Sequence, residues 1–453
     1  MKTLHLTNMF HPSSGGVHTF YRALLKAASP ENQVRLVVPW ESDGVEDVND
    51  HARIYHVRAP HHVFVDPRYR VVLPHRFLLP YRSTVQKILQ REQPDLVEIC
   101  DKYSFVYLGS CLRKGWMRGV RRPAVVGLTS ERMDDNVKQF LCRGKLGERF
   151  SRYYMHRVYL PMFDFHIAIS EYTAAELIAA NEGHTMHRRE VWVCPMGVDA
   201  ARFRPSPQRK MLRRERIAEV AGNESTRLLL YTGRLSLEKN LPLLVETMTS
   251  LCGDSRHDYR LLVAGDGPER GRLETEMERA APGRAHFLGH VSDREELAEL
   301  FAAADAFLHP NPREPFGIAP LEAMASGLPL VAPSQGGVLS FANQANAWLA
   351  KPRGEDFARA VRDIFEHPQS RASRCALARR TAEGLGWDRV TAEYFALYDR
   401  LHNRFRQWQL GQNAAARPTT SHVSRADYAG TRAGQTARLV YAWNDVFRHT
   451  ASP

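Results

Sequence analysis

Residues 314–329 read EPFGIAPLEAMASGLP, a stretch that predicts the start of a helix with an acidic residue just before it. Pro320 has no backbone N–H, so it suits the first turn of a helix, where the amides have no partner within the helix. The stretch therefore predicts a helix over residues 318–326 that ends at Gly327, because glycine suits the turn after a helix. Glu314 then lies in the loop before the helix.

This helix start has the properties of a phosphate site. The amides of Gly317 and Ile318 point out of the helix, with the positive end of its dipole behind them. Glu314 in the loop and Glu322 in the helix add acceptors for a ligand with hydroxyl groups on both sides of its phosphates, and a sugar nucleotide is such a ligand. The alternative is an ordinary loop-to-helix junction, since acids are common near helix starts.

Length and composition predict a protein of two domains with additions, because the chain has 453 residues and 43% of them are hydrophobic. No apolar run approaches the roughly 20 residues of a membrane-spanning helix. The first residues, MKTLHL, read as a strand and not as a signal peptide, and the six cysteines are scattered without a Cys-x-x-Cys pair. We therefore expect a cytoplasmic protein without a disulfide framework or a metal site.

The net charge of +12 is compatible with anionic partners such as lipid headgroups or phosphorylated small molecules. The basic residues are not gathered into one tail, and no aromatic-basic module for RNA or DNA is visible. We therefore expect no nucleic-acid partner.

Short apolar segments alternate with helical segments twice along the chain, which predicts parallel sheets covered by helices on both faces. The fold class is therefore α/β, with two nucleotide-binding-type domains. Strands are expected in the first half at residues 4–7, 34–39, 54–57, 95–100, 124–129 and 165–170, and in the second half at residues 191–199, 228–234, 260–268, 285–291, 306–310 and 331–333.

Helices and a tail complete the predicted organisation. A charged helix is expected over residues 208–220 and a long helix over residues 388–410. Residues 411–434 lack an apolar period, so disorder or a linker is expected there. Residues 436–449 predict an amphipathic helix that docks on the body of the protein or contacts a membrane.

Two loops that follow predicted strands carry residues suited to a ligand, and ligands bind at the carboxyl edge of parallel sheets. Gly15 and Gly16 follow the first strand and permit close approach of the backbone to a ligand, although such a pair is also common in simple turns. Arg234 and Lys239 follow a strand of the second half, in GRLSLEKN. Cations at that edge would neutralise a diphosphate, whereas isolated loop cations usually face solvent.

Five motifs occur in a characteristic order within roughly residues 1–400: GGV at 15–17, PMGVD at 195–199 with Phe203-x-Pro205, GR-x4-K at 233–239, AGDGP at 264–268 and E-x7-E at 314–322. Together they resemble the retaining glycosyltransferases of the GT4 family. The resemblance implies a GT-B fold, in which two Rossmann-like doubly wound domains face each other across a cleft. Residues 1–190 would form the acceptor domain and residues 191–387 the donor domain, with the helix at 388–410 crossing back to the first domain and residues 411–453 forming a tail.

The same resemblance assigns roles to individual residues of the donor site. Its catalytic residues would be Arg234 and Lys239, which hold the donor diphosphate, and Glu314, which reaches the donor sugar. Glu322 would bind the ribose hydroxyls. The remaining residues of the donor site would be Gly233, Phe316, the amides of Gly317 and Ile318 at the phosphates, the backbone of His290 and Val291 at the base, and Gly16 from the other domain once the cleft closes.

The chemistry implied by the resemblance is transfer of a hexose with retention of its anomeric configuration. The donor would be a GDP- or UDP-hexose, with mannose favoured over glucose, and the acceptor a glycan, a lipid-linked molecule or a small molecule. The leaving diphosphate would help to deprotonate the acceptor, so no strong nucleophile and no cofactor is expected. No Asp-x-Asp occurs in the chain, which agrees with a metal-independent reaction.

One position departs from the family pattern. Family members commonly place a histidine after the strand that corresponds to residues 124–129, whereas this chain has Thr129 or Ser130 there, followed by Glu131. Either a polar substitute orients the donor sugar or the acceptor side is organised differently. His166 and His18 are other candidates for this role, and both also fit ordinary structural histidines.

The basic and aromatic residues 64–82 lie in the half that holds the acceptor in this family. They suit a lipid-linked or anionic acceptor and peripheral contact with the inner face of a membrane, or else form a solvated loop. Two alternative functions stay open at this point: a nucleotide-sugar epimerase of the same fold, and a catalytically silent binding subunit.

Overall fold

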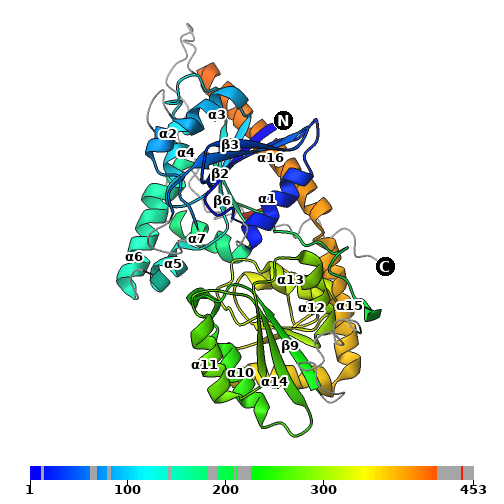
Figure 1. Cartoon of the computed structure of the whole chain (residues 1–453). Helices are drawn as coiled ribbons and strands as arrows, with labels where there is room; N and C mark the ends of the chain where they lie inside the picture. The colour runs from blue at the N-terminus through cyan, green and yellow to red at the C-terminus, as the bar shows by residue number, and fades with distance from the viewer. Residues whose placement is uncertain are drawn as a thin grey trace, which may run out of the picture.

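The computed structural model describes residues 1–11, 15–61, 69–78, 83–140, 144–181, 191–208, 211, 226–415 and 440–441. Figure 1 shows two α/β domains, one above the other, each built around a sheet with helices on both faces. The predicted fold class is therefore confirmed.

The first sheet contains nine strands within the described residues, in the order β15-β8-β7-β6-β5-β1-β2-β4-β3. All neighbours pair in parallel except β3 and β4, which are antiparallel. The central strands are apolar and buried on both faces, as a sheet covered by helices requires. The strands are β1 (Lys2–Thr7), β2 (Gln33–Trp40), β3 (Gly44–Asn49), β4 (Ala52–Arg58), β5 (Leu96–Cys100), β6 (Ala124–Thr129), β7 (Phe165–Ala168), β8 (Val191–Val193) and β15 (Val440–Tyr441).

The helices of the first domain cover both faces of this sheet. Helix α1 starts directly after Gly15 and buries four large side chains, Phe20, Tyr21, Leu24 and Leu25. The helices are α1 (Gly16–Lys26), α2 (His75–Leu78), α3 (Thr84–Glu92), α4 (Val106–Arg113), α5 (Met133–Phe140), α6 (Lys145–Tyr154) and α7 (Glu171–Asn181).

The second sheet contains six parallel strands within the described residues, in the order β11-β10-β9-β12-β13-β14. The chain starts in the middle at β9, builds outward to β11, and then continues on the other side from β12. The order therefore reverses between β9 and β12, and ligands bind at such switch points. The strands are β9 (Thr226–Thr232), β10 (Asp258–Ala264), β11 (Ala285–Gly289), β12 (Ala306–Leu308), β13 (Leu330–Pro333) and β14 (Trp348–Ala350).

Within the described residues, the α-helices of the second domain run from α10 to α15. They are α10 (Pro242–Cys252), α11 (Arg270–Ala280), α12 (Arg294–Ala303), α13 (Ile318–Ala325), α14 (Gly354–Glu366) and α15 (Pro368–Gly384).

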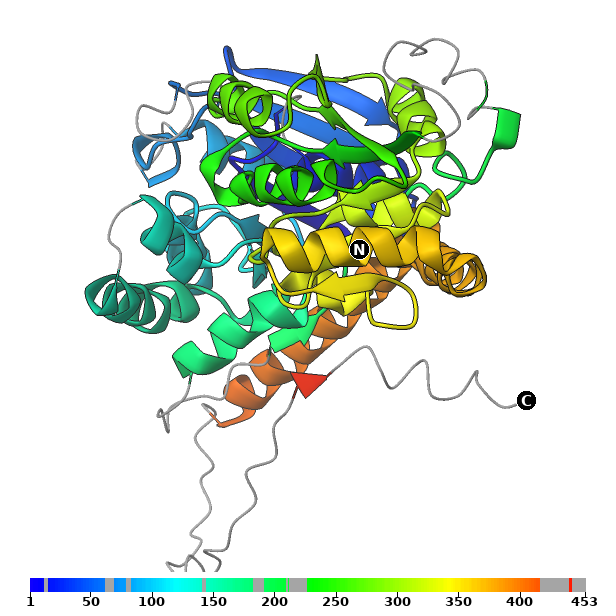
Figure 2. The same cartoon turned by 90° about the horizontal axis from the view of Figure 1, so that it is seen from below.

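The long helix α16 (Trp387–Ala415) follows the second domain in sequence but packs on the first, as Figures 1 and 2 show in orange. The Tyr398 hydroxyl donates to the buried carboxylate of Glu98 on β5 at 2.5 Å. The same carboxylate accepts a hydrogen bond from Tyr21 at 3.0 Å and lies 2.9 Å from Nδ1 of His5. A buried carboxylate without partners would be costly, so this network fixes α16 on the first domain.

The tail departs from the sequence-based expectation in two places. Helix α16 continues to Ala415, into the segment expected to be disordered, because its last residues include the strong helix former alanine. Val440 and Tyr441 were expected in an amphipathic helix, but they pair in parallel with β8, whose edge would otherwise leave backbone groups unpaired. Three predicted segments lie wholly or partly outside the described residues: the rest of that helix, most of the helix at 208–220, and residues 64–68 and 79–82 of the basic segment.

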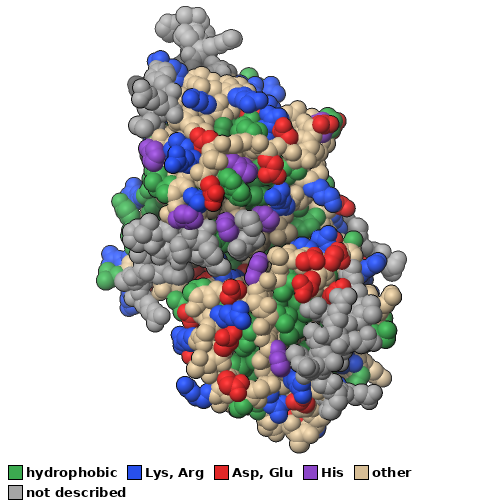
Figure 3. All heavy atoms as spheres, viewed as in Figure 1, with side chains coloured by type: hydrophobic (Ala, Val, Ile, Leu, Met, Phe, Trp, Pro, Cys, Tyr) green, Lys and Arg blue, Asp and Glu red, His purple; other side chains and the backbone are tan. Residues whose placement is uncertain are grey.

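Charge is distributed over the surface without one dominant patch on the face shown in Figure 3, where blue and red side chains are interspersed.

Candidate functional site

The two domains meet through the carboxyl edges of their sheets. A Cβ added to Gly16, the first residue of the helix that follows β1, would lie 3.2 Å from Cδ1 of Ile318 at the start of α13. The Ser170 hydroxyl, just after β7, donates to the Pro315 carbonyl at 2.5 Å. The loops that follow the strands of both sheets therefore face each other, which is where both domains would contact a shared ligand.

The helix expected at residues 318–326 is present as α13, so this prediction is confirmed. Gly317 precedes it with a φ of 102°, in the left-handed region, and Gly327 follows it with a φ of 69°. Only glycine adopts these conformations at little cost. The N-terminus of α13, with the positive end of its dipole, opens onto the domain interface beside Gly16.

Lys239 and Glu314 form an ion pair in front of this helix start, with 2.9 Å between Nζ and Oε2. The amide of Asn311 donates to the same carboxylate oxygen at 2.9 Å, and the N–H of Gly337 donates to the Glu314 carbonyl at 2.7 Å. Burial opposes ionisation of Glu314, but the Lys239 ammonium outweighs it and lowers the pKa of the carboxyl to about 2. Glu314 is therefore an anion throughout the physiological range.

Arg234 lies in the same loop as Lys239 and receives contacts from both domains. Its guanidinium is 3.5 Å from the Glu238 carboxylate and 5.6 Å from the centre of the Tyr69 ring, which belongs to the first domain.

The loops after β9 and β10 are in close contact. A Cβ added to Gly265 would come within 1.9 Å of the carbonyl oxygen of Gly233. Gly265, the first glycine of the AGDGP motif, thus lets the backbones of these two loops pack directly against each other.

Glu322 is deeply buried on α13, with 3% of its side chain exposed, and pairs with Arg294 at 2.5 Å. Burial raises the pKa of Glu322 although the Arg294 guanidinium opposes this shift. Arg294 begins α12, directly after the loop that contains His290 and Val291. The pair therefore connects Glu322 to the loop that is expected to contact the base of the donor nucleotide. In that loop, His290 is exposed and Val291 is half-buried.

The side chain of Phe316 lies in the core and not at the site surface. It is 2% exposed and packs against Phe341 with 5.1 Å between ring centres. Phe316 was expected among the donor-binding residues. Its side chain instead anchors the loop, so only its backbone lies where a ligand would contact it.

Several residues around the ion pair were not singled out from the sequence: His309, Asn311, Arg313 and Arg294. His309 follows β12 at the switch point of the second sheet and is buried, and burial lowers its pKa to about 4, so its imidazole is neutral near neutral pH. Arg313 Nη2 donates to Oε1 of Gln139 on α5 at 2.9 Å, across the domain interface. Their positions in the sequence could have identified them as site residues, since they follow a strand of the second sheet or begin the next helix.

On the other side of the domain interface, the residues at the end of β6 that differ from the family pattern contact other residues of the first domain. The Thr129 hydroxyl lies 3.2 Å from the hydroxyl of Tyr159, and the Ser130 hydroxyl lies 3.2 Å from Sγ of Cys100. Glu131 is half-buried, and burial raises the pKa of its carboxyl. Thr129 and Ser130 are thus occupied by structural contacts.

The two alternative histidines differ in position. His166 is fully buried on β7, where its ring packs against Tyr159 and Phe163, so it is a core residue. His18 lies on α1 with its ring 4.5 Å from that of Phe10, and burial together with the nearby Arg22 lowers its pKa to about 4. Of the two, only His18 lies on the helix that begins at the domain interface.

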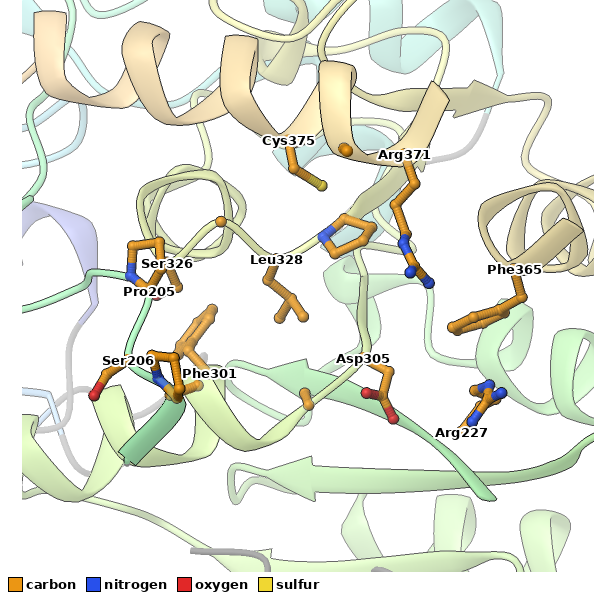
Figure 4. Close-up of a pocket in the computed structure, with 16 residues that line it drawn as sticks. Pro205, Ser206, Arg227, Phe301, Asp305, Ser326, Leu328, Phe365, Arg371 and Cys375 are labelled. Carbon is orange, nitrogen blue, oxygen red and sulfur yellow. The ribbon is translucent and has the colours of Figure 1, made fainter. Parts of the chain in front are cut away.

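A cavity of about 590 Å³ opens at the opposite edge of the second sheet, near the first residues of β9, β12 and β13. Figure 4 shows Arg371 and Cys375 pointing into it from α15, opposite Asp305 and Leu328. Ligands of parallel sheets bind at the carboxyl edge. This cavity lies at the opposite edge, so it is separate from the site around Lys239 and Glu314.

Among the described residues, no group of three or more His, Cys, Asp or Glu side chains is arranged to hold a metal ion.

Comparison with known proteins identifies the family. The model described as "Glycosyltransferase Family 4" matches residues 14–202, and "Glycosyl transferases group 1" matches residues 213–381. The chain is 31% identical over 404 residues to the GDP-mannose-dependent alpha-(1-6)-phosphatidylinositol dimannoside mannosyltransferase of Mycobacterium tuberculosis, an alignment that covers 87% of this chain and 95% of that protein. The chain belongs to glycosyltransferase family 4. It is a hexosyltransferase, and the family named from the sequence motifs is confirmed.

Solved structures of similar fold support the same conclusion about architecture. Sucrose-phosphate synthase from Thermosynechococcus elongatus superposes with a TM-score of 0.70 at 19% identity, covering 89% of this chain and 99% of that chain. Anabaena Alr3699/HepE in complex with UDP-glucose gives a TM-score of 0.63 at 20% identity, covering 87% of this chain and 99% of that chain. This family 4 chain therefore has the GT-B arrangement of two facing α/β domains.

Proposed function

We propose that this glycosyltransferase transfers mannose from GDP-mannose, with retention of configuration, to a lipid-linked or glycan acceptor. The observation that carries the proposal is the Lys239–Glu314 pair, which lies in front of the α13 start at the switch point of the second sheet. The choice of GDP-mannose is supported by the mycobacterial relative, whose name specifies that donor. Transfer of glucose from a UDP donor is the main alternative, and the test below distinguishes these two donors.

The geometry suggests a role for each group around the donor. The ammonium of Lys239 and the guanidinium of Arg234 would compensate the negative charge that develops on the leaving diphosphate. The N-terminus of α13 at Gly317 and Ile318 would add backbone donors to the same oxygens. Glu314, kept ionised by Lys239, would accept hydrogen bonds from sugar hydroxyls.

The reaction would break the bond between C1 of the sugar and the diphosphate oxygen. The acceptor hydroxyl would bond to C1 on the same face, which retains the configuration, and its proton would pass to the leaving diphosphate. Glu314 would remain unprotonated throughout, because its pKa of about 2 makes it a poor proton carrier near neutral pH.

We also propose that this reaction needs no metal, because Arg234 and Lys239 supply the charge that a metal would otherwise bring to the diphosphate. Turnover should therefore survive an excess of a chelator such as EDTA. Loss of turnover in EDTA and recovery on adding a divalent cation would contradict this part.

We further propose that the enzyme is cytoplasmic and works at the inner face of a membrane. The mycobacterial relative is named for a phosphatidylinositol dimannoside, and no helix of the described residues has the length and apolar character to span a bilayer. Access to a lipid-linked acceptor would then require peripheral contact.

The test is incubation of the purified protein with a panel of GDP- and UDP-hexoses, with release of free nucleotide measured over time. The expected result is slow release of GDP from GDP-mannose in preference to the other donors. Interconversion of the sugar without nucleotide release would instead identify an epimerase, and absence of both binding and release for every donor would identify a silent binding subunit.

A further inference from the structure

Helix α6 presents three large apolar side chains to solvent. Leu146 is 74% exposed, Phe150 53% and Tyr153 64%. Their spacing of four and three residues places them on one face of the helix, while the small residues Gly147 and Ser151 are buried against the domain. The stability of the folded domain does not explain this arrangement, because a helix normally buries its large apolar side chains and exposes its small ones.

Basic residues flank this apolar face. Lys145, Arg149 and Arg152 are all exposed. The single acidic residue of the helix, Glu148, pairs with Lys138 of α5 at 3.1 Å, so its charge is compensated within the protein. We name Leu146, Phe150 and Tyr153 with these three cations the α6 face.

We propose that the α6 face binds the surface of an anionic lipid bilayer. Apolar and aromatic side chains flanked by Lys and Arg match the two layers that such a surface offers, acyl chains below and anionic headgroups above. A protein partner of ordinary composition would not require three cations around three apolar side chains. The helix has 10 residues, too few to cross a bilayer, so it lies in the plane of the headgroups.

The α6 face lies one helix away from the contact between the domains. Lys138 of α5 binds α6, and the next residue, Gln139, accepts a hydrogen bond from Arg313, the neighbour of Glu314. Packed helices lie about 10 Å apart, and Figure 2 shows the teal α5 and α6 projecting together from the body. If the proposed transfer to a lipid-linked acceptor holds, this docking would present the acceptor near the site without removing it from the membrane.

The test uses the full-length protein and flotation with vesicles of phosphatidylcholine alone or with about one third of phosphatidylglycerol. Wild type should float with the anionic vesicles and much less with the neutral ones, and added salt should weaken the binding. Phe150→Ser and the double variant Arg149→Glu/Arg152→Glu should each lower the partition coefficient by about tenfold or more. Their thermal unfolding should match wild type, because all three side chains are exposed.

Two variants elsewhere serve as matched controls. Leu410→Ser removes an equally exposed apolar side chain from α16, and Arg353→Glu/Arg359→Glu makes the same charge change on exposed arginines near and in α14. Both should float like wild type. If the α6 variants float as well as these controls, or if wild type does not bind anionic vesicles, the proposal is overturned.

Two further outcomes separate this surface from the proposed function. Vesicle binding that depends on the α6 face, in a protein that releases no nucleotide from any donor, would support the docking surface and remove the proposed transfer. A protein that turns over donor but is dimeric in sedimentation, becomes monomeric with Phe150→Ser and ignores vesicles would overturn membrane docking in favour of a second copy of the chain.

Discussion

Lys239 keeps the Glu314 carboxyl ionised at a partly buried place. The Lys239 side chain is 23% exposed and that of Glu314 14%, so water screens the pair incompletely. Without Lys239, the Glu314 carboxylate would keep the hydrogen bond from Asn311 but lose its opposite charge. The pair therefore affects both turnover and stability, which can be measured separately.

The first prediction concerns turnover. Lys239→Ala should lower kcat/KM by about 100-fold or more, because one preorganised cation at a developing charge contributes about 3 kcal/mol. Binding of guanosine alone should change little, since the nucleoside lacks the diphosphate. Steady-state kinetics and calorimetry provide the two measurements, and Lys87→Ala, on the exposed side of α3, is the control. Equal loss of turnover and of guanosine binding would rule out a diphosphate role.

The second prediction concerns pH. The folded-state pKa of Glu314, about 2, lies below the roughly 4.3 of an unfolded glutamate. Its ionisation therefore adds stability above pH ~4, and this contribution is lost as the pH falls toward 2. In Lys239→Met, burial would raise that pKa, so the ionised carboxylate would destabilise the fold by about 3 kcal/mol near neutral pH.

The Tm difference between wild type and Lys239→Met should consequently be largest near pH 7 and shrink as the pH falls through the raised pKa of the variant's Glu314 toward 2. Carboxylates away from this pair titrate alike in both proteins, so the difference between their melting curves reports Glu314 together with its buried neighbour His309, whose pKa is lowered by burial and also by Lys239. A Tm difference that stays constant from neutral to acidic pH would contradict the ion pair as its cause.

At the scale of the element, α13 was well predicted because its signals are local. Pro320 in the first turn and Gly327 after the last turn act on neighbouring residues, and the structure places the helix at Ile318–Ala325. The same holds for most strands of the two sheets, whose apolar runs are characteristic of burial on both faces. The strand expected at residues 191–199 in the second half is an exception: it is β8 (Val191–Val193) and pairs with β7 in the first sheet.

Elements and contacts that depend on distant partners were missed. Strand β3 is exposed at all six residues and owes its existence to pairing with β4. The Glu322–Arg294 pair joins residues 28 apart, and the contact between Gln139 and Arg313 joins residues 174 apart. No local pattern encodes such pairs, since the fold itself brings them together.

The third prediction concerns the start of α13. Gly317→Ala forces an alanine to a φ of 102° and brings its Cβ to 3.2 Å from Pro320 Cγ, which should cost about 1–2 kcal/mol. The loop should shift to relieve this strain, so KM for the donor should rise. Thermal unfolding and donor titration measure the two effects. Gly253→Ala, at a negative φ with open space around it, should leave both unchanged; an equal effect at the two sites would contradict the prediction.

At the scale of the whole molecule, the contact between Gly16 and Ile318 limits how closely the domains approach. A valine at position 16 would clash with Ile318 Cδ1, which already lies 3.2 Å from an added Cβ. The fourth prediction is that Gly16→Val lowers kcat by up to about 100-fold through misplacement of the two halves of the site. Nucleotide binding, which we assign to the second domain, should change less than twofold on the same argument.

Small-angle scattering with bound nucleotide should show a larger radius of gyration for Gly16→Val than for wild type. Gly271→Val is the control, because Gly271 also lies in the first turn of a helix, α11, with nothing within contact distance. If nucleotide binding falls as much as kcat, the substitution has damaged the site itself and the domain-approach explanation is wrong.

The hydrogen bond from Tyr398 to Glu98 has a consequence for how the protein is made. It joins residues 300 apart, and at about 5–20 residues per second the ribosome needs roughly 15–60 s to synthesise that interval. During this time the sheet of the first domain lacks the helix that covers it and the hydroxyl that binds its buried carboxylate. The strands and helices of the second domain are complete before α16 emerges, so we expect the first domain to reach its final packing only after the second domain has been synthesised.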